Sequence, residues 1–392
     1  MQFNPFSPDF QRDPYPYYAM LRSFQPMFHW AEWRSWFLTS YEDNNTLLRD
    51  KRLGREVWRI PHRDLPQEFI SFLALDRNLL LFRDPPDHTR LRGLVHKAFT
   101  PRMVEQLRER IEAITDDLLN QMTGTVDLVE ALAYPLPLTV IAELLGVPPK
   151  DRPRLRNWSR AIVTMLEIRP SQQEIRAASS SAVEFTGYLI NLIQQRRRQP
   201  QDDLLSQLIQ VQEEQDHLTE NELIGTAMLL LVAGHETTLN LIGCGMLALL
   251  KHPDQLQLLR DAPGMIRQAV EEMLRYDSPI QIANRFVMEA FEYNGQQFRR
   301  GEQIIFALGA ANRDAERFPQ PETFNIHRTD NPHLAFGSGI HYCLGAPLAR
   351  LEAEIAISHL LRRFPNIRLG DGKAAYRSSF VLRGLKALPV RL

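Results

Sequence analysis

The chain has 392 residues, 44% hydrophobic and 24% charged, which is the composition of a folded globular protein and not of a disordered or fibrous one. Its 46 basic and 47 acidic residues leave a formal net charge of −1, so the overall charge predicts no nucleic acid partner. Two cysteines, Cys244 and Cys343, are too few for a disulfide framework or a cysteine-rich zinc site, and the N-terminus lacks a signal-peptide pattern, so we expect a cytoplasmic protein.

The N-terminal part of the chain predicts short, mixed elements. We expect a helix at 14–24, a hairpin rich in Phe and Trp at 27–39, and a helix at 41–50. The segment 57–84 has no regular period, and a long irregular loop of this kind more often shapes a site than builds a core.

Helices dominate from residue 87 onward. Thr100 and Pro101 form a helix start, and Thr219 with Glu222 has the pattern of a capping box. Residues 286–306 alternate like strands around an Asn294-Gly295 hairpin signal, and short strands follow the last helix. The chain therefore predicts a mainly α fold with a small β region, as a single domain over 1–392. The expected helices lie at 87–98, 101–122, 136–145, 153–168, 172–199, 202–213, 219–250, 264–276 and 344–364.

The most apolar stretch, 226–250, is long enough to cross a membrane. Its middle carries His235, Glu236 and Thr237, where a spanning helix of about 20 residues is driest. We therefore interpret it as the buried helix of a soluble protein, with no membrane partner.

The sharpest local signal is the run from Phe336 to Gly345, in which glycines bend the backbone and Cys343 stands just before a helix. The N-terminus of a helix favours a thiolate, which is the form of cysteine that binds iron. The alternative is an ordinary buried cysteine on a loop. A dinucleotide fingerprint does not fit because Tyr342 stands where it needs glycine, and His235 lacks the second histidine of a zinc peptidase, since Leu239 occupies that position.

This run resembles the FxxGxxxCxG loop of the cytochrome P-450 family, in which a cysteine thiolate ligates haem. The resemblance implies the cytochrome P-450 fold and one haem b, with Cys343 as the iron ligand. It further implies that Phe336, His341 and Gly345 of the same loop contact the haem.

A second stretch, from Glu272 to Arg275, places two opposite charges three residues apart on one helix face. Such a pair is usually a weak, solvated surface contact. The resemblance implies instead the ExxR pair of the family, joined by Arg328 from a later turn-rich segment. Its implied role is to hold the scaffold beside the haem and not to react.

A third stretch, from Ala233 to Thr238, puts polar groups in the middle of the apolar helix. A locally bent core helix would explain them, because threonine can bond to a carbonyl one turn earlier. By resemblance, Ala233 and Gly234 leave room for dioxygen, while Thr237 and Glu236 hold water and pass protons to it. Cleavage of the oxygen–oxygen bond consumes protons in a site that must otherwise stay dry.

The fourth matching stretch follows Asp87, where His88 and Arg92 are four residues apart and share a helix face. A solvated basic face is the alternative interpretation. The resemblance implies that His88, Arg92, Arg285 and His333 donate hydrogen bonds to the haem propionates.

The family resemblance also implies an enzyme, a monooxygenase that hydroxylates or oxidatively cleaves a hydrophobic substrate. Electrons would come from NAD(P)H through a ferredoxin or flavodoxin with its reductase, because the chain carries no flavin or ferredoxin segment. The substrate would be a small hydrophobic molecule, free or carrier-bound, and we expect a monomer. Candidates for the docking patch of an acidic electron carrier are Arg90, His96, Lys97 and Arg350.

The sequence says less about the substrate than about any other property of the protein. The overall run resembles soluble bacterial members that act on macrolides, other polyketides or fatty acyl chains, including those of biotin synthesis, and steroids or terpenoids remain alternatives. Apolar side chains are expected to line the substrate pocket, namely Leu80, Leu81, Leu229, Val232, Ala233, Ile280 and Ile282.

Two rival functions remain open. A peroxygenase would use hydrogen peroxide directly and would not need the acid–alcohol pair, which this chain retains at Glu236 and Thr237. A haem carrier or sensor would need no proton relay. Product formation with reductant and partner, with peroxide alone, or with neither distinguishes the three.

Overall fold

The computed structural model describes residues 4–60, 77–167, 170–213 and 218–392. It is mainly helical with small sheets, as the sequence predicts. The chain divides into two compact units, each built from separated segments. The first unit comprises Met1–Leu53, Leu107–Leu136 and Thr237–Leu392, and the second comprises Gly54–Gln106 and Pro137–Glu236.

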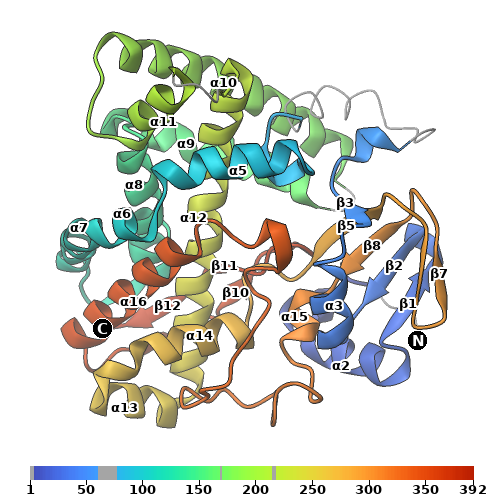
Figure 1. Cartoon of the computed structure of the whole chain (residues 1–392). Coiled ribbons are helices and arrows are strands. Elements are labelled where there is room, and N and C mark those ends of the chain that lie inside the picture. Colours follow the sequence, from blue (N-terminus) through green and yellow to red (C-terminus); the bar gives the residue numbers. More distant parts are fainter. Residues whose placement is uncertain (1–3, 61–76, 168–169, 214–217) are drawn as a thin grey trace. The chain divides into compact units, whose positions relative to one another are not determined.

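A five-stranded mixed sheet is the main β element of the first unit (Figure 1). Its β1 and β2 form the predicted antiparallel hairpin, β2 then pairs in parallel with β8, and β8 pairs antiparallel with β5. The side chains of Ile304, Ile305 and Phe306 on β8 are fully buried, because this strand has a neighbour on each side and is covered on both faces. In sheet order the strands are β1 (Met27–Trp30), β2 (Ser35–Leu38), β8 (Gln303–Phe306), β5 (Ala283–Val287) and β3 (Leu53–Gly54).

Three smaller sheets complete the β structure described. The hairpin between β6 and β7 turns at Asn294 and Gly295, whose φ angles of 47° and 71° confirm the predicted turn. The small sheets consist of β6 (Phe291–Tyr293) with β7 (Gln296–Phe298), β10 (Ala375–Tyr376) with β11 (Leu385–Ala387), and β4 (Thr125–Asp127), β12 (Pro389–Arg391) and β9 (Arg368–Leu369).

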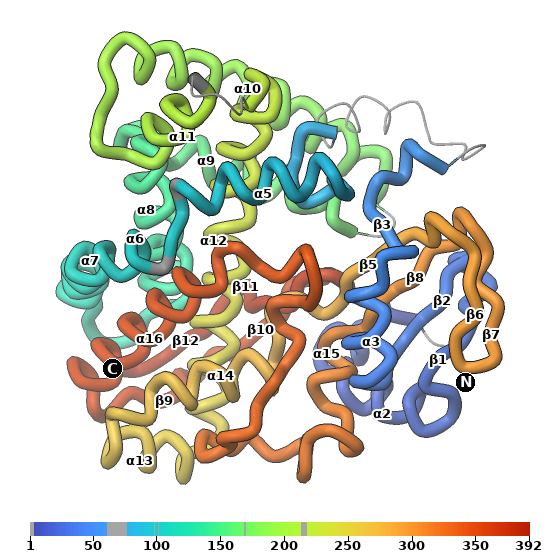
Figure 2. Tube along the Cα trace, in the orientation of Figure 1, coloured from blue at the N-terminus to red at the C-terminus, as the bar shows by residue number. Residues whose placement is uncertain are grey.

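The C-terminal helix of the first unit, α16, packs against other helices of that unit. Helices α14 and α7 both pack against α16, and Figure 2 shows α14 running beside it. The sequence did not predict α13, a short helix that starts at Pro253 directly after α12. These helices are α1 (Pro8–Arg12), α2 (Tyr15–Phe24), α3 (Tyr41–Leu47), α7 (Arg108–Asn120), α13 (Pro253–Asp261), α14 (Ile266–Tyr276), α15 (Leu308–Ala311) and α16 (Ala346–Arg363).

The second unit is a helical layer in which α10 packs against α9 and α11, and α11 against α5. Two predicted helices are shorter than expected. The helix expected at 101–122 is broken at Leu107 into α6 and α7, and the one expected at 153–168 ends at Val163, with residue 168 outside the described residues. The helices are α5 (Asp87–Ala98), α6 (Pro101–Gln106), α8 (Pro135–Leu144, which starts in the first unit), α9 (Arg152–Val163), α10 (Gln172–Arg198) and α11 (Leu204–Glu213).

Helix α12 (Glu220–Lys251) contributes its first half to the second unit and its second half to the first. Its predicted capping box is present: the Glu222 N–H donates to Thr219 Oγ1 at 3.2 Å, and the Thr219 N–H donates to Glu222 Oε2 at 2.9 Å. Among the described residues this is the one helix long and apolar enough to cross a membrane, but 72% of its most apolar window is buried inside the protein. Such burial is typical of a core helix.

Candidate active site

The loop before α16 is closed by backbone hydrogen bonds. The Cys343 N–H donates to the Phe336 carbonyl at 3.0 Å, and the chain bends at Gly337 and Gly339, whose φ angles are 71° and 72°. These left-handed values favour glycine. A side chain at Gly339 would also come within 2.7 Å of the carbonyl oxygen of Leu48. Glycine is therefore needed in this loop for both conformation and space.

Cys343 is half-buried and forms no disulfide with Cys244, the other described cysteine. It lies three residues before α16 starts at Ala346, two residues later than the sequence predicts. A Cβ atom at Gly345 would lie 3.9 Å from the Cys343 sulfur, so this glycine is directly beside the thiol. A half-buried thiol just before a helix N-terminus fits a thiolate metal ligand.

The middle of α12 has an accessible strip on one face, although the helix is otherwise mostly buried. Its members are three or four positions apart, as one helix face requires. The predicted pocket residue Val232 lies outside the strip and is buried. The strip consists of Leu229, Leu230, Ala233, Gly234 and Thr237.

The glycine in this strip also has a packing role. A Cβ atom at Gly234 would lie 3.1 Å from Cγ1 of Ile141 on α8, which is tighter than an ordinary carbon contact. The absence of a side chain at Gly234 therefore lets α8 and α12 approach closely. The sequence analysis expected only that this glycine leaves room for a ligand.

Glu236 is fully buried, and its neighbour His235 is 1% exposed. The His235 Nε2 lies 3.5 Å from Glu236 Oε1, and its Nδ1 lies 2.9 Å from the carbonyl oxygen of Leu231. The sequence singled out Glu236 and Thr237 but missed the histidine beside the carboxyl. An acid with an adjacent imidazole and a hydroxyl on the next residue can hold a proton inside a dry segment.

The Glu272–Arg275 pair is fully buried and is not a surface contact. Two hydrogen bonds of 2.8 Å join the guanidinium to the carboxylate, and Arg328 approaches the same carboxylate at 3.3 Å. The remaining donors of Arg275 reach the carbonyl oxygens of Asn312, Pro321 and Thr323 at 2.8–3.0 Å. The pair therefore clamps the turn-rich segment onto α14.

A second ion cluster lies one residue away on α14. Arg350 of α16 bonds both oxygens of Glu271 at 2.6 and 2.9 Å, and His333 Nε2 lies 3.1 Å from the same carboxylate. Burial acts to raise the pKa of Glu271, but hydrogen bonds from Arg350 and His333 outweigh it and lower the pKa to about 2. The Arg350 guanidinium also covers the Phe336 ring, 4.5 Å from its centroid.

This cluster includes two of the predicted functional residues. The second ring nitrogen of His333 accepts the Ala335 N–H at 3.3 Å, so both nitrogens have protein partners. The assignment of His333 to the haem propionates stays a prediction. Arg350, expected in a docking patch, is an internal support of the cysteine loop, because Glu271 and the Phe336 ring occupy its guanidinium.

The other predicted propionate donors are placed separately in the two units. Arg285 on β5 is 5% exposed and donates to the carbonyl of Asn284. His341, which was predicted only to contact the haem, is half-buried within the cysteine loop. His88 is buried and Arg92 half-buried, one turn apart on α5. In each unit the cationic or hydrogen-bonding side chains needed for carboxylates are thus held on regular elements.

The remaining docking candidates also differ. Arg90 on α5 forms an ion pair with Glu222 on α12, while His96 and Lys97 are exposed at the end of α5. Arg90 therefore serves the packing of these two helices. Beside Cys343, the exposed side chains are instead Ile340 and Tyr342, at 48% and 40%.

The predicted substrate stretch Ile280–Ala283 lies along the C-terminal segment. Ile280 forms a bridge with Leu382, and the Gln281 N–H donates to the Val381 carbonyl at 2.8 Å. Ile280 is half-buried and Ile282 buried; in the second unit, Leu80 is buried and Leu81 half-buried. The sequence missed the contribution of residues 380–382, whose only signal is a short apolar run.

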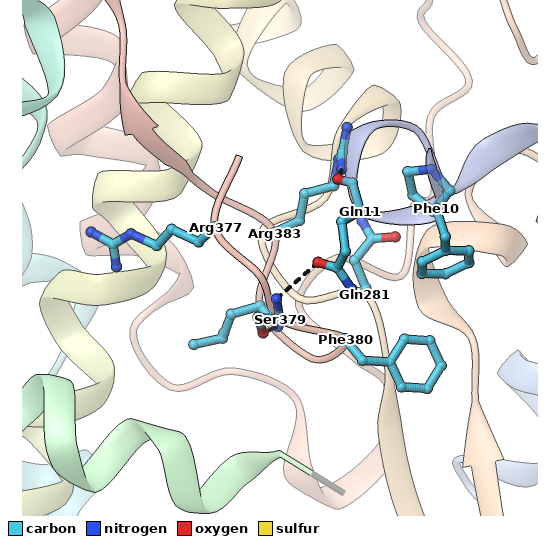
Figure 3. Close-up of a pocket in the computed structure, with 9 residues that line it drawn as sticks. Phe10, Gln11, Gln281, Arg377, Ser379, Phe380 and Arg383 are labelled. Atoms are coloured by element: carbon cyan, nitrogen blue, oxygen red, sulfur yellow. Dashed lines mark hydrogen bonds between the residues drawn. The ribbon is translucent and has the colours of Figure 1, made fainter. Parts of the chain in front are cut away.

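Behind this stretch lies a small cavity of about 10 Å³, the size of one water molecule (Figure 3). The Gln281 amide lines this cavity and donates to Tyr15 at 3.3 Å and to the Ser278 carbonyl at 2.9 Å. It is too small for an organic substrate and acts as a packed support. Its lining consists of Phe10, Gln11, Pro14, Gln281, Arg377, Ser379, Phe380, Leu382 and Arg383.

These features were compared with known proteins. A sequence profile of the Cytochrome P-450 family matches residues 67–262 and 264–381, which include the accessible strip of α12, the buried ExxR pair and the cysteine loop. The chain belongs to the cytochrome P-450 family. Members of this family are haem-iron monooxygenases, so the predicted enzyme class is confirmed.

This cytochrome P-450 is similar to curated bacterial members over nearly its whole length. Polyketide biosynthesis cytochrome P-450 PksS of Bacillus subtilis (strain 168) is 41% identical over 100% of this chain and 99% of that protein. Cytochrome P-450 monooxygenase PikC of Streptomyces venezuelae is 45% identical over 98% of this chain and 92% of that protein. The similarity therefore extends well beyond the short motifs.

Solved structures confirm the predicted fold. The crystal structure of P-450 BioI in complex with hexadec-9Z-enoic acid ligated acyl carrier protein superposes with a TM-score of 0.93. It is 39% identical and covers 98% of this chain and 100% of that chain. This cytochrome P-450 thus has the family fold over its length.

Proposed function

We propose that this cytochrome P-450 is a haem b monooxygenase that hydroxylates a medium-sized hydrophobic acyl or polyketide substrate with electrons from a separate redox protein. The observation that carries the proposal is the position of Cys343, held by a glycine-bent, hydrogen-bonded loop just before α16. Bound haem supplies the activation of dioxygen. Every other part of the chemistry is assigned to residues of this chain.

Cys343 would hold the iron as thiolate. Its backbone N–H is already engaged by Phe336, which keeps the loop in one conformation before any ligand binds. The propionates would accept hydrogen bonds from Arg285, His341, His88 and Arg92, since charged donors bind carboxylates strongly.

Glu236 and Thr237 would hold water and move protons along α12. The Glu236 carboxyl is sealed from solvent and faces His235, whereas Thr237 lies on the accessible strip. A proton can thus be stored at the buried carboxyl and delivered at the hydroxyl without opening the segment to bulk water. A peroxide-driven enzyme or a haem carrier has no use for this pair.

The redox partner would be a ferredoxin or flavodoxin, itself reduced by NAD(P)H through a reductase in the cytoplasm. The exposed Ile340 and Tyr342 shortly precede Cys343 in the chain, and apolar side chains at such a position suit a transient protein contact. His96 and Lys97 remain available for electrostatic attraction of an acidic partner. We expect the enzyme itself to be a monomer.

Hydrocarbon is the favoured substrate chemistry. The side chains proposed to contact it are aliphatic and include Leu80, Leu229, Ile280 and Ile282, and burial of apolar surface contributes about 25 cal/mol per Å² before ordering costs. Relatives named for polyketide work and a neighbour bound to an acylated carrier protein favour acyl chains, free or carrier-linked. Titration of fatty acids, macrolides and steroids against the ferric haem spectrum tests this ranking.

The decisive experiment compares the wild type with Cys343→Ser. Reduced wild type with carbon monoxide should show the strongly red-shifted band of thiolate-ligated haem, and Cys343→Ser should lose it. Cys244→Ser is the matched control, because Cys244 is buried away from the loop and should leave the band unchanged. A thiolate band that survives in Cys343→Ser would overturn the assignment.

Turnover assays separate the proposed function from its rivals. Product should form with reductant and a ferredoxin or flavodoxin system, and far less with peroxide alone. Efficient product formation with peroxide alone would identify a peroxygenase, and haem binding without product under either condition would identify a carrier or sensor.

A further inference from the structure

Asn312 is a fully buried amide that joins three segments of the first unit. Its Nδ2 donates to Ser278 Oγ at 2.7 Å, and its Oδ1 accepts the Leu334 N–H at 2.6 Å. Its carbonyl accepts from Arg275 Nη1 at 2.9 Å, and its N–H donates to the Leu308 carbonyl at 3.0 Å. Both ends of the side chain and both backbone groups are therefore bonded.

Two partners of the Asn312 side chain lie at the end of α14 and at the start of the cysteine loop. Ser278 follows the end of α14 and donates to the Leu274 carbonyl at 2.7 Å, so it continues the helix that carries the ExxR pair. Leu334 lies at the base of the cysteine loop, and its carbonyl accepts the Gly337 N–H at 2.8 Å. The Asn312 amide thus bridges the ExxR helix and the start of the cysteine loop.

The bridge continues to the thiol through backbone groups. Leu334 is buried in a hydrophobic cluster, so its N–H has no access to water as a substitute acceptor. Two residues later the Phe336 carbonyl accepts the Cys343 N–H. Movement of Leu334 would therefore be transmitted to the peptide that orients the Cys343 sulfur.

We propose that Asn312 is a positioning residue that holds the cysteine loop in the conformation required for thiolate ligation. This inference rests on the proposed function, in which Cys343 binds the iron. Without the Asn312 amide, the Leu334 N–H loses its acceptor and the loop gains freedom at its base. The loop then releases the thiolate under milder conditions than those that unfold the protein.

The test follows two signals during guanidinium titration of the haem-loaded protein: the thiolate band of the carbon monoxide complex and the far-ultraviolet helix signal. In Asn312→Ala the thiolate band should be lost at clearly lower denaturant concentration than the helix signal, with a wider gap than in the wild type. Asn312→Asp keeps an acceptor for the Leu334 N–H and should restore most of the wild-type gap.

Thr39→Val is the matched control. Thr39 is also fully buried in the first unit, and its hydroxyl donates to the Pro26 carbonyl at 3.0 Å, away from the cysteine loop. Its loss should move both signals together. If Asn312→Ala also moves both signals together, the amide stabilises the fold in general and the proposal is wrong.

Two further outcomes are informative. If Asn312→Ala yields no folded protein, Ser278→Ala replaces it, because loss of the Ser278 hydroxyl removes the acceptor that orients the Asn312 amide. The gap should then widen in Ser278→Ala, and an unchanged gap in that variant would refute the proposal. If Cys343→Ser retains the thiolate band, the proposed function is wrong. If Cys343→Ser loses the band but Asn312→Ala shows the same gap between the two signals as the wild type, only the inference about Asn312 is wrong.

Discussion

Removal of Arg275 should cost the protein most of its folded, haem-loaded form. The guanidinium is fully buried and makes two hydrogen bonds to Glu272 and three to backbone carbonyls. Removal of one partner of a buried ion pair lowers the free energy of unfolding by about 3–5 kcal/mol. Arg275→Ala should lie near the upper end of this range, because three backbone carbonyls also lose a charged donor. Because domains are stable by only about 5–15 kcal/mol, this loss is a large share of the total.

Haem content per folded protein and guanidinium midpoints measure this effect. Arg275→Lys retains the charge but has three donors for five acceptors, so it should lie between Arg275→Ala and the wild type. The control is Asp330→Ala, which breaks the Arg317–Asp330 pair, where Asp330 is 75% exposed. This surface variant should not differ measurably from the wild type. Wild-type yield, haem content and midpoint in Arg275→Ala would refute the reasoning.

Three further variants test single groups. Thr237→Ala should bind substrate and accept electrons normally but form at least about tenfold less product per reducing equivalent, because proton-transfer groups raise reaction rates by about 10²–10⁴-fold. The electrons that do not reach product should appear as peroxide. An unchanged product yield per NAD(P)H would remove Thr237 from the mechanism. Burial raises the pKa of Glu352 well above its usual 4.5, and neither of its oxygens has a hydrogen-bond partner among the described residues. Because a raised pKa in the folded state makes stability fall as pH rises above about 4.5, Glu352→Gln should be more stable than the wild type at pH 7, and this advantage should shrink toward pH 4.5 in denaturation series. The lowered pKa of Glu271 has the opposite effect on stability. The stabilisation of the fold that Glu271 contributes is present above about pH 4.5 and is lost as pH falls toward 2. Arg350→Ala should therefore lower the free energy of unfolding by about 1–2 kcal/mol at pH 7 and by progressively less in acid. A loss of stability that does not vary with pH would show that the lost contact with the Phe336 ring dominates.

Local patterns in the sequence predicted a large part of this enzyme. The period of apolar residues located most of the long helices, the Thr219–Glu222 box correctly marked the start of α12, and Asn294-Gly295 marked a hairpin. These signals depend on residues within one or two turns of each other, so the chain carries them without any knowledge of its folded form. The family motifs around Cys343 and Glu272 are local for the same reason.

The partners of individual polar side chains were not predictable in this way. The sequence could not predict the contact between His333 and Glu271. These two residues are 62 positions apart and meet only when α14 packs beside the cysteine loop. The same applies to the bridge formed by Asn312 over 34 and 22 positions.

Packing also decided the roles of small and apolar residues. Gly234 contacts Ile141 because α8 crosses α12 at that point, and the C-terminal residues 380–382 join Ile280 through a strand pairing with no local signal. A hydrogen bond or close contact between distant segments leaves no period in the sequence, since any residue with a donor, an acceptor or a suitable volume could occupy either side. The elements and the cysteine motif are therefore encoded by local sequence, whereas the contacts around that motif form only when the elements pack together.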